Sequence, residues 1–211
     1  MDKKIFKTEQ ENFWAGEFGN NYIQRNQGDA LLASNLDFFV KALKQTRNIQ
    51  SCIEFGANIG MNLKAIGLLF PDLDAHGVEI NHTAAELLSQ TIAIENVYQT
   101  SLLTFEPIRT WDLTLIKGVL IHINPDELHA VYAKLIQTCR RYLLVAEYYN
   151  PSPLTIPYRG HLDRLFKRDF AGEILDQYPE MKLIDYGFSY RRDPNFPQDD
   201  ITWFLMEKTN L

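Results

Sequence analysis

Two acidic residues, Glu54 and Glu79, each end a short apolar run that is typical of a buried β-strand. Glu54 precedes a loop with glycine at both ends, Gly56 and Gly60, and a helix-like run follows. Backbone N–H groups of such a loop, and the helix N-terminus behind it, can face a bound ligand. Glu79 lies 25 residues after Glu54, close to the spacing at which nucleotide-binding α/β units place a carboxylate on ribose hydroxyls. The pattern predicts a nucleotide-type cofactor; the alternatives are a structural turn and a solvated strand end.

The elements that must position these residues alternate along the chain. Apolar residues at three- and four-residue steps predict helices, and short apolar runs predict strands. Asn124 suits an N-cap, Pro125 the first helical position and Glu127 a capping box. Residues 150–160 carry three prolines and are predicted to form a loop. We expect helices at 30–44, 61–70, 82–94, 125–138 and 169–177, and strands at 51–55, 76–80, 97–100, 112–117, 142–147, 182–190 and 201–208.

This alternation predicts an α/β fold. The first five strands should form a mostly parallel sheet with helices on both faces. The last two strands have no helix between them, so they should form a hairpin that places one antiparallel strand in the sheet. With 211 residues we expect a single domain. Its parts are an N-terminal aromatic segment and helix (1–47), a cofactor-binding core (48–150), an acceptor-site lid (151–181) and a C-terminal hairpin (182–211).

Composition narrows the classes of function. Hydrophobic residues make up 45% and charged residues 23%, which indicates a globular chain, and the net charge of −6 argues against a nucleic-acid binder. The sequence has no apolar run long enough to cross a membrane and no signal-peptide core at the N-terminus, so we expect a cytoplasmic protein with no membrane partner. Two cysteines and five histidines show no metal-ligand spacing, so no metal site is expected. The sequence does not indicate the oligomeric state.

The loop GANIG at 56–60, with Glu54 before it and Glu79 beyond it, resembles the cofactor site of class I methyltransferases that use S-adenosylmethionine (SAM). The expected strand pattern fits their Rossmann-like, seven-stranded fold. More narrowly, nearly the whole chain resembles the pseudaminic acid biosynthesis-associated methylase family. The phrases that carry this resemblance are FWAGEFG at 13–19, KGVLIHINP at 117–125, EYYNP at 147–151, YRGH at 158–161 and FKRDFAG at 166–172.

The resemblance implies a set of cofactor-binding residues. Glu79 would accept hydrogen bonds from the ribose hydroxyls. Asn58 replaces the middle of three alternate glycines, and asparagine tolerates the positive φ that such a turn needs. These enzymes often place an acid after the third strand to read the adenine amine, whereas this chain has Ser101 and Leu102, which would accept one hydrogen bond and stack on the ring. Arg25 would reach the methionine carboxylate, and Lys117 either lies at the surface or points into the site. The full set of expected cofactor-binding residues is Arg25, Glu54, Gly56, Asn58, Gly60, Glu79, Ser101, Leu102, Lys117 and Gly118.

The resemblance also implies an acceptor side. His122 and Glu147 follow the fourth strand and end the fifth, so they are the candidate catalytic residues that would take a proton from a hydroxyl or ammonium; the alternative for His122 is a packing role. Tyr148 and Tyr149 would stack on a sugar or lie at the rim. A basic stretch would bind a carboxylate or phosphate, or form a solvated face; if helical, its members at 164, 167 and 168 share one side. Its substrate-binding candidates are Arg159, His161, Arg164 and Arg168, beside Lys167.

We therefore expect a SAM-dependent methyltransferase whose acceptor is a small polar molecule, an anionic sugar related to pseudaminic acid, its precursor or its conjugate. A second hypothesis is a non-catalytic cofactor-binding or assembly protein of a sugar pathway. A third is a nicotinamide-dependent oxidoreductase, because glycine loops and ribose acids serve those enzymes too. Asn62 and Leu63 stand where that fingerprint would carry its helix-packing glycine. The acceptor atom, oxygen, nitrogen or carbon, stays open.

Overall fold

A seven-stranded sheet organises the molecule. The computed structural model describes residues 6–209, apart from the side chains of residues 161 and 162. The strand order is β3-β2-β1-β4-β5-β9-β8. β9 pairs antiparallel with both neighbours and the other pairs are parallel, which confirms the predicted sheet. The strands are β1 (Ser51–Phe55), β2 (Asp74–Glu79), β3 (Val97–Gln99), β4 (Trp111–Lys117), β5 (Cys139–Glu147), β8 (Met181–Ser189) and β9 (Ile201–Lys208).

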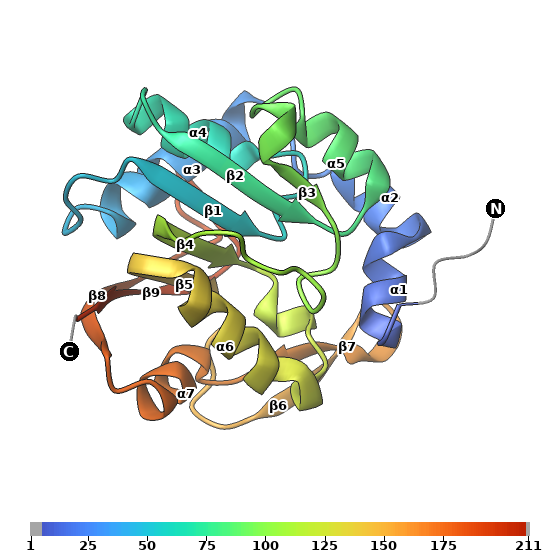
Figure 1. Ribbon diagram of the computed structural model, residues 1–211. Coiled ribbons are helices and arrows are strands. Elements are labelled where there is room, and N and C mark those ends of the chain that lie inside the picture. Colours follow the sequence, from blue (N-terminus) through green and yellow to red (C-terminus); the bar gives the residue numbers. More distant parts are fainter. Residues whose placement is uncertain (1–5, 210–211) are drawn as a thin grey trace.

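Helices cover both faces of this sheet (Figure 1). β1 is buried at every position, as expected of a central strand with helices above and below it. α3 (Asp29–Ala42), α4 (Met61–Leu69) and α5 (His82–Leu88) lie on one face, and α6 (Leu128–Thr138) and α7 (Phe170–Gln177) lie on the other.

Two helix predictions were wrong in detail. The helix expected over 82–94 ends at Leu88, where the N–H groups of Thr91 and Ile92 both turn back to the Leu88 carbonyl, and a 3₁₀ turn (Ile94–Asn96) follows. The helix expected from residue 125 begins as a 3₁₀ turn (Pro125–Glu127), with the Asn124 side chain accepting from the Asp126 N–H. Glu127 does not close the expected capping box, and its carboxylate pairs instead with Lys7 at 2.7 Å.

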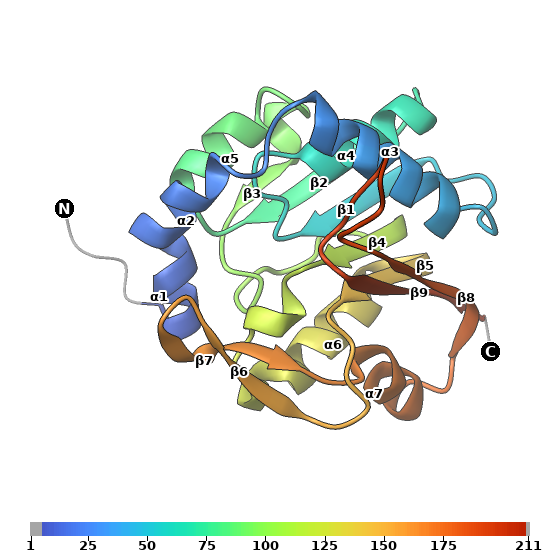
Figure 2. The same ribbon diagram turned by 180° about the vertical axis from the view of Figure 1, so that it is seen from behind.

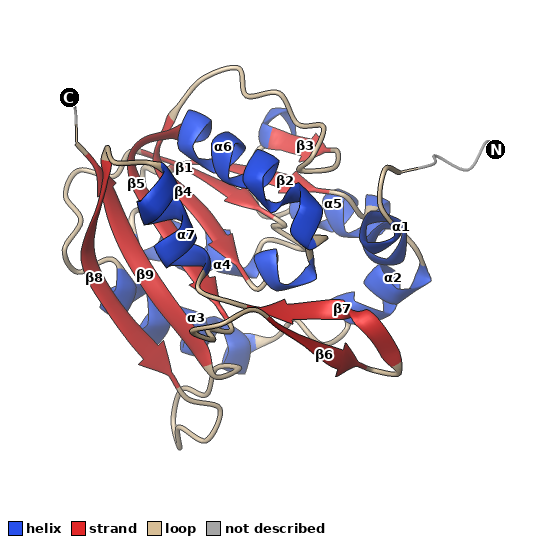
Figure 3. Ribbon diagram, turned by 90° about the horizontal axis from the view of Figure 1, so that it is seen from below, coloured by secondary structure: helices blue, strands red, loops and turns tan. Residues whose placement is uncertain are grey.

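The segment predicted as a proline-rich loop and basic helix is a β-hairpin. β6 (Leu154–Tyr158) pairs antiparallel with β7 (His161–Lys167). Arg159 and Gly160 connect them with φ of 47° and 87°, and a two-residue turn with positive φ at both positions matches the twist of a hairpin. The hairpin stands apart from the main sheet (Figure 3). The basic side chains therefore do not share a helix face.

Three segments gather at the carboxyl ends of the parallel strands. α1 (Glu9–Ala15) and α2 (Glu17–Ile23) lie across this edge, and the β6–β7 hairpin lies beside α1 (Figures 1 and 2). From the far side of the sheet, the β8–β9 loop reaches up to α3, where the Gln198 amide donates to Asn35 Oδ1 at 3.0 Å (Figure 2). The sheet edge and these three covers enclose one cavity.

Candidate functional site

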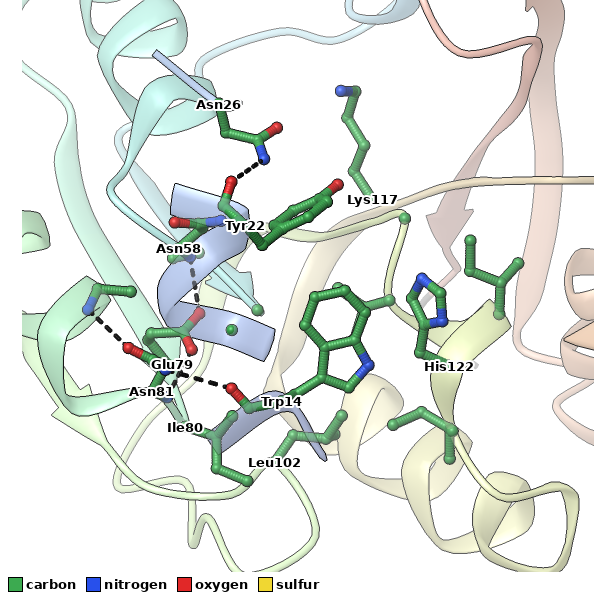
Figure 4. Close-up of a pocket in the computed structure, with 18 of the residues that line it drawn as sticks. Trp14, Tyr22, Asn26, Asn58, Glu79, Ile80, Asn81, Leu102, Lys117 and His122 are labelled. Atoms are coloured by element: carbon green, nitrogen blue, oxygen red, sulfur yellow. Dashed lines mark hydrogen bonds between the residues drawn. The ribbon is translucent and has the colours of Figure 1, made fainter. Parts of the chain in front are cut away.

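The cavity has a volume of about 390 Å³, within the range that small-molecule and cofactor sites occupy. Loops after β1, β2 and β4 form its floor. α1 and α2, the start of α3 and residues 198–201 form its walls. Figure 4 shows Glu79 and Asn58 on one side and His122 on the other, with the Trp14 ring between them.

The loop after β1 has the backbone that its residue types predict. Gly56, Asn58 and Gly60 have φ of 74°, 48° and 84°. A Cβ on Gly56 would lie 2.4 Å from Val119 Cγ2, so glycine is needed there for space as well as for conformation. Asn58 adopts the left-handed conformation that asparagine tolerates better than most residues. The loop thus brings Gly56, Ala57 and Asn58 to the cavity.

Glu79 lies at the junction of two loops and lines the cavity. One carboxylate oxygen accepts from the Asn58 N–H at 2.8 Å, and the other accepts from the Asn81 N–H at 2.7 Å. Burial raises the pKa of this carboxyl, while backbone hydrogen bonds from Asn81, Asn58 and Ile80 lower it. A carboxylate has more acceptor positions than these backbone donors fill, so Glu79 can still accept a further donor, such as a ribose hydroxyl.

Glu54 lies beneath the loop, outside the cavity lining. It is fully buried, and its Oε1 accepts from the Asn62 amide at 2.6 Å. Burial raises the pKa of Glu54 to about 8, against the hydrogen bond from Asn62 and the charge of Lys117. Gly60 also lies outside the lining, where a Cβ would be 2.7 Å from Leu88 Cδ1. Both predicted cofactor residues therefore support the loop from below.

The end of β4 brings Lys117 and Gly118 into the lining, so of the two positions considered for Lys117 the structure has the one in the cavity. Gly118 has φ of 68° and faces open space. The Lys117 ammonium lies 5.4 Å from the centroid of the Phe38 ring. Burial lowers the pKa of Lys117, and the charges of Glu54, Asp199 and Glu147 oppose this shift. Lys117 and Tyr22 extend toward the same side of the cavity (Figure 4).

Ser101 and Leu102 line the cavity after β3, and a residue that sequence reasoning missed joins them. Glu11, on α1, also lines the cavity, and its carboxylate accepts a hydrogen bond from the Ser101 hydroxyl. Glu11 itself has no sequence signal of a site residue, because its partner is 90 residues away. The density of aromatic residues at 13–22 was the available signal that this segment docks on the site.

Aromatic rings form the wall opposite Glu79. Trp14 lies 4.6 Å from the His122 ring and 5.2 Å from Tyr22, measured between centroids. Tyr158, at the end of β6, lies 5.1 Å from His122. Trp14, Tyr22 and Tyr158 were not assigned to the site from sequence. Because the rings come from α1, α2, the turn after β4 and the hairpin, only the folded chain brings them together.

The two predicted catalytic residues differ in their surroundings. His122 lines the cavity, and its Nδ1 lies 2.6 Å from the Arg164 carbonyl oxygen, so Nδ1 carries the proton and Nε2 keeps a lone pair. Burial lowers the pKa of His122 to about 4. Glu147 lies outside the lining and accepts from the N–H groups of Val119 and Leu120 at 3.0 and 2.9 Å. Burial raises the pKa of Glu147 to about 7.

The structure divides the remaining acceptor candidates. Tyr148 and Arg159 line the cavity. Tyr149 is exposed and lies near Phe204, with 5.9 Å between ring centroids. Arg25 is exposed and outside the lining, although Tyr22 and Asn26 of the same segment line it.

The other basic residues face partners outside the cavity. Arg164 pairs with Glu9 on α1 at 2.9 Å, and Arg168 pairs with Glu173 on α7 at 2.6 Å. Lys167 lies 5.1 Å from the Tyr148 ring centroid. The side chain of His161 is outside the described part of the structure. Of the predicted anion-binding stretch, only Arg159 is placed at the cavity by the described side chains.

Comparison with known proteins places the fold. No family model matches the chain, and no curated protein matches it. Solved structures do match. Magnesium protoporphyrin IX methyltransferase from Synechocystis, solved with bound SAM, is 13% identical with a TM-score of 0.66 over 98% of this chain and 100% of that one. A Burkholderia thailandensis 1,6-didemethyltoxoflavin-N1-methyltransferase, solved with its substrate and S-adenosylhomocysteine, is 12% identical with a TM-score of 0.70 over 100% and 94%.

A SAM-dependent methyltransferase from Leishmania major is 14% identical, with a TM-score of 0.67 over 96% of this chain and 86% of that one. The chain therefore has the Rossmann-like fold of class I SAM-dependent methyltransferases. Its sheet also differs from the 3-2-1-4-5-6 order of dinucleotide-binding dehydrogenases, because the antiparallel strand β9 lies between β5 and β8. No described helix is long and apolar enough to cross a membrane.

The residues of the cavity fit SAM. Asn58 Oδ1 and Trp14 Nε1 are buried with no hydrogen-bond partner, and such atoms are rare unless a ligand or water pairs with them. Both belong to residues that line the cavity. Glu79 and the loop at Asn58 would hold the ribose and methionine portions, and Leu102 would contact the base.

Proposed function

We propose that the protein is a methyltransferase that uses SAM and acts on a small polar acceptor. One observation carries the proposal: the Glu79 carboxylate, held by the N–H groups of Asn58 and Asn81, faces a cavity of cofactor size at the carboxyl ends of β1, β2 and β4. In open α/β sheets, ligands bind at this edge of the strands. Relatives in fold, solved with SAM or S-adenosylhomocysteine, support the same assignment.

When bound, SAM supplies a methyl group that is already activated on a sulfonium. The chain must then align the acceptor, exclude water and receive a proton from a hydroxyl or ammonium acceptor. α1, α2 and the β6–β7 hairpin cover the cavity, and their aromatic residues Trp14, Tyr22 and Tyr158 form an apolar wall that suits water exclusion.

His122 is the proton-handling residue of this proposal. Its Nδ1–H is held by the Arg164 carbonyl, which leaves Nε2 as an acceptor. A pKa of about 4 keeps the ring neutral at physiological pH, so it can accept a hydrogen bond from the acceptor without first losing a proton. Glu147 is better assigned to positioning, because its carboxylate holds the backbone of the turn that carries His122.

The end of the cavity that would hold the acceptor carries polar and cationic groups. Lys117 and Arg159 provide positive charge, and Tyr22, Tyr148 and Asp199 provide hydroxyl and carboxylate groups. An acceptor with several hydroxyls and a carboxylate, such as a pseudaminic acid-related sugar, its precursor or its conjugate, would pair with this set. The link to pseudaminic acid rests on the sequence resemblance, and the two cations at the cavity support an anionic acceptor.

Calorimetry with SAM and S-adenosylhomocysteine tests the cofactor assignment. Both compounds should compete for one site, and Glu79→Ala should weaken binding about 10- to 100-fold, since a carboxylate hydrogen bond contributes roughly 1.5–3 kcal/mol. Glu79→Gln keeps one acceptor oxygen, so its affinity should fall between those of the wild type and Glu79→Ala. Glu95→Ala, at an exposed acid of the 3₁₀ turn before β3, is the matched control and should bind like the wild type. No heat with either compound would contradict the proposal.

Transfer of a labelled methyl group from SAM to pseudaminic acid, its precursors and its nucleotide-linked form tests the acceptor. Labelling of one of them supports the acceptor class, and mass spectrometry of the product identifies the methylated atom. Binding of SAM without transfer to any of these compounds would favour a cofactor-binding or assembly protein. Binding of NAD(H) without SAM would favour an oxidoreductase.

A further inference from the structure

This chain carries Ser101 after β3, where class I methyltransferases often have a base-reading acid, yet a carboxylate lies beside it. Glu11 reaches this position from α1, and the Ser101 hydroxyl donates to its Oε1. Both residues are buried and both line the cavity. The chain therefore places an acid beside the end of β3 by way of its N-terminal helix.

The other contacts of Glu11 hold its carboxylate in place. Its Oε2 accepts from the Thr8 N–H at 2.8 Å and from the Thr8 hydroxyl at 3.0 Å, which closes a capping box at the start of α1. Oε2 is thus occupied by two donors, while Oε1 has one donor, Ser101. A carboxylate oxygen accepts about two hydrogen bonds, so Oε1 keeps one acceptor position.

Apolar residues beside this carboxylate suit a planar base. Leu102, which follows Ser101, and Ile80, which follows Glu79, both line the cavity. In Figure 4 these two side chains lie on the same side of the cavity, next to Glu79 and below Trp14. A base attached to a ribose held by Glu79 would therefore lie between apolar side chains, with the Glu11 carboxylate at its edge.

We propose that Glu11 is the residue that selects adenine, by accepting a hydrogen bond from the 6-amino group of the base. This inference rests on the proposed function, because the base is that of SAM. An ionised carboxylate can only accept, so it pairs with the amino group of adenine and repels the 6-carbonyl oxygen of hypoxanthine. The segment that covers the cavity thereby also reads the base.

Binding of S-adenosylhomocysteine and S-inosylhomocysteine, measured by calorimetry, tests the assignment. The two compounds differ at the base position that Glu11 would contact. The wild type should prefer the adenosyl compound by about 10- to 100-fold, the range expected when a buried polar group loses its partner. Glu11→Gln should reduce this preference to about threefold or less, because an amide can donate to a carbonyl as well as accept. Adding Ser101→Asp to Glu11→Gln should restore it by supplying an acid from the β3 side.

Thr8→Ala is the control for a purely structural role. It removes the capping hydroxyl of α1 but keeps the Glu11 carboxylate, so it should lower stability and the affinity for both compounds while the preference stays. An unchanged preference in Glu11→Gln, or no preference in the wild type, would overturn the assignment and leave the proposed function intact. Failure of the wild type to bind S-adenosylhomocysteine would instead contradict the proposed function, and the assignment would fall with it.

Discussion

Glu79 ends β2 and Glu54 is the last residue but one of β1, yet their side chains meet different surroundings. Glu79 faces the cavity and is paired with two backbone N–H groups, whereas Glu54 is enclosed in the core with one amide partner. One Glu54 oxygen, Oε2, is buried with no partner. A buried carboxyl with so few hydrogen-bond donors is costly to ionise. The free energy of unfolding should therefore decrease as the pH rises and the unfolded chain loses this proton.

Glu54→Gln should therefore stabilise the protein at alkaline pH. The folded pKa of about 8 exceeds the ordinary value of 4.5, so the unfolded chain releases the proton first as pH rises. Stability is consequently lost between about pH 4.5 and 8, by up to roughly 5 kcal/mol for this shift. The variant lacks this loss, so urea denaturation at pH 5.5 and 8.5 should show a gain over the wild type that grows with pH. Glu95→Gln, at an exposed site, is the control; an equal gain at both pH values would contradict the burial argument.

At the scale of elements, the packing of α1 and α2 over the cavity depends on close backbone contact and on hydrogen bonds from Asn81. The Asn81 amide donates to Asn20 Oδ1 at 2.8 Å and to the Trp14 carbonyl at 3.3 Å. Asn81 also pairs through its N–H with Glu79. Glu79, which would bind the ribose, is thus bonded to Asn81, whose side chain holds α1 and α2 in place. The packing of α2 should therefore affect binding at the cavity.

Gly19→Ala should loosen the packing of α1 and α2 over the cavity. An added Cβ would lie 1.9 Å from the Trp14 carbonyl oxygen and 2.7 Å from the Asn81 amide, so α2 must move. We expect a loss of about 1–3 kcal/mol in unfolding free energy, as overpacking typically costs, and weaker binding of S-adenosylhomocysteine. Gly67→Ala, in α4, is the matched control because its Cβ would meet open space. That variant should gain roughly 0.5–1 kcal/mol and bind normally. Equal stabilities of the two variants in urea denaturation would contradict this view of α2.

At the scale of the whole molecule, the sheet brings distant segments to one edge. Residues 8–26, the turn after β4, the hairpin and residues 198–201 all contribute to the lining. No described residue of α7 belongs to the lining, and this helix lies on the same face of the sheet as α6 (Figure 1). A ligand in the cavity should therefore stabilise segments at both ends of the chain together and leave α7 unaffected.

Hydrogen–deuterium exchange with and without S-adenosylhomocysteine measures this coupling. Slower exchange is expected in α1, α2 and residues 198–201, which contact the cavity, because ligand binding disfavours their local opening. α7 serves as the internal control and should exchange at the same rate in both states. Protection confined to the loop at Asn58, with none in α1 or α2, would show that the cover does not contact the ligand.

Local sequence determined most of the strands of the sheet and its first two loops. The strand–loop–helix turn at 51–69 and the acid at residue 79 depend on glycine conformation, apolar runs and short-range hydrogen bonds, all of which are encoded within about 30 residues. The hairpin at 154–167 was mispredicted because prolines and basic residues gave no periodicity, while the turn at Arg159 and Gly160 and the packing against α1 decided its form.

Only the tertiary structure decided which side chains share the cavity. Glu11 meets Ser101 across 90 positions, and Gln10 meets the Asp163 carbonyl across 153. The same packing turned Arg164 toward Glu9 and enclosed Glu147 beneath the turn that carries His122. Such contacts depend on how separate elements pack, and the residue types in each segment do not specify a partner far along the chain. The sequence therefore determined the glycine loop and Glu79, whereas folding determined how α1 and α2 cover the cavity, the position of Glu11 and the aromatic wall opposite Glu79.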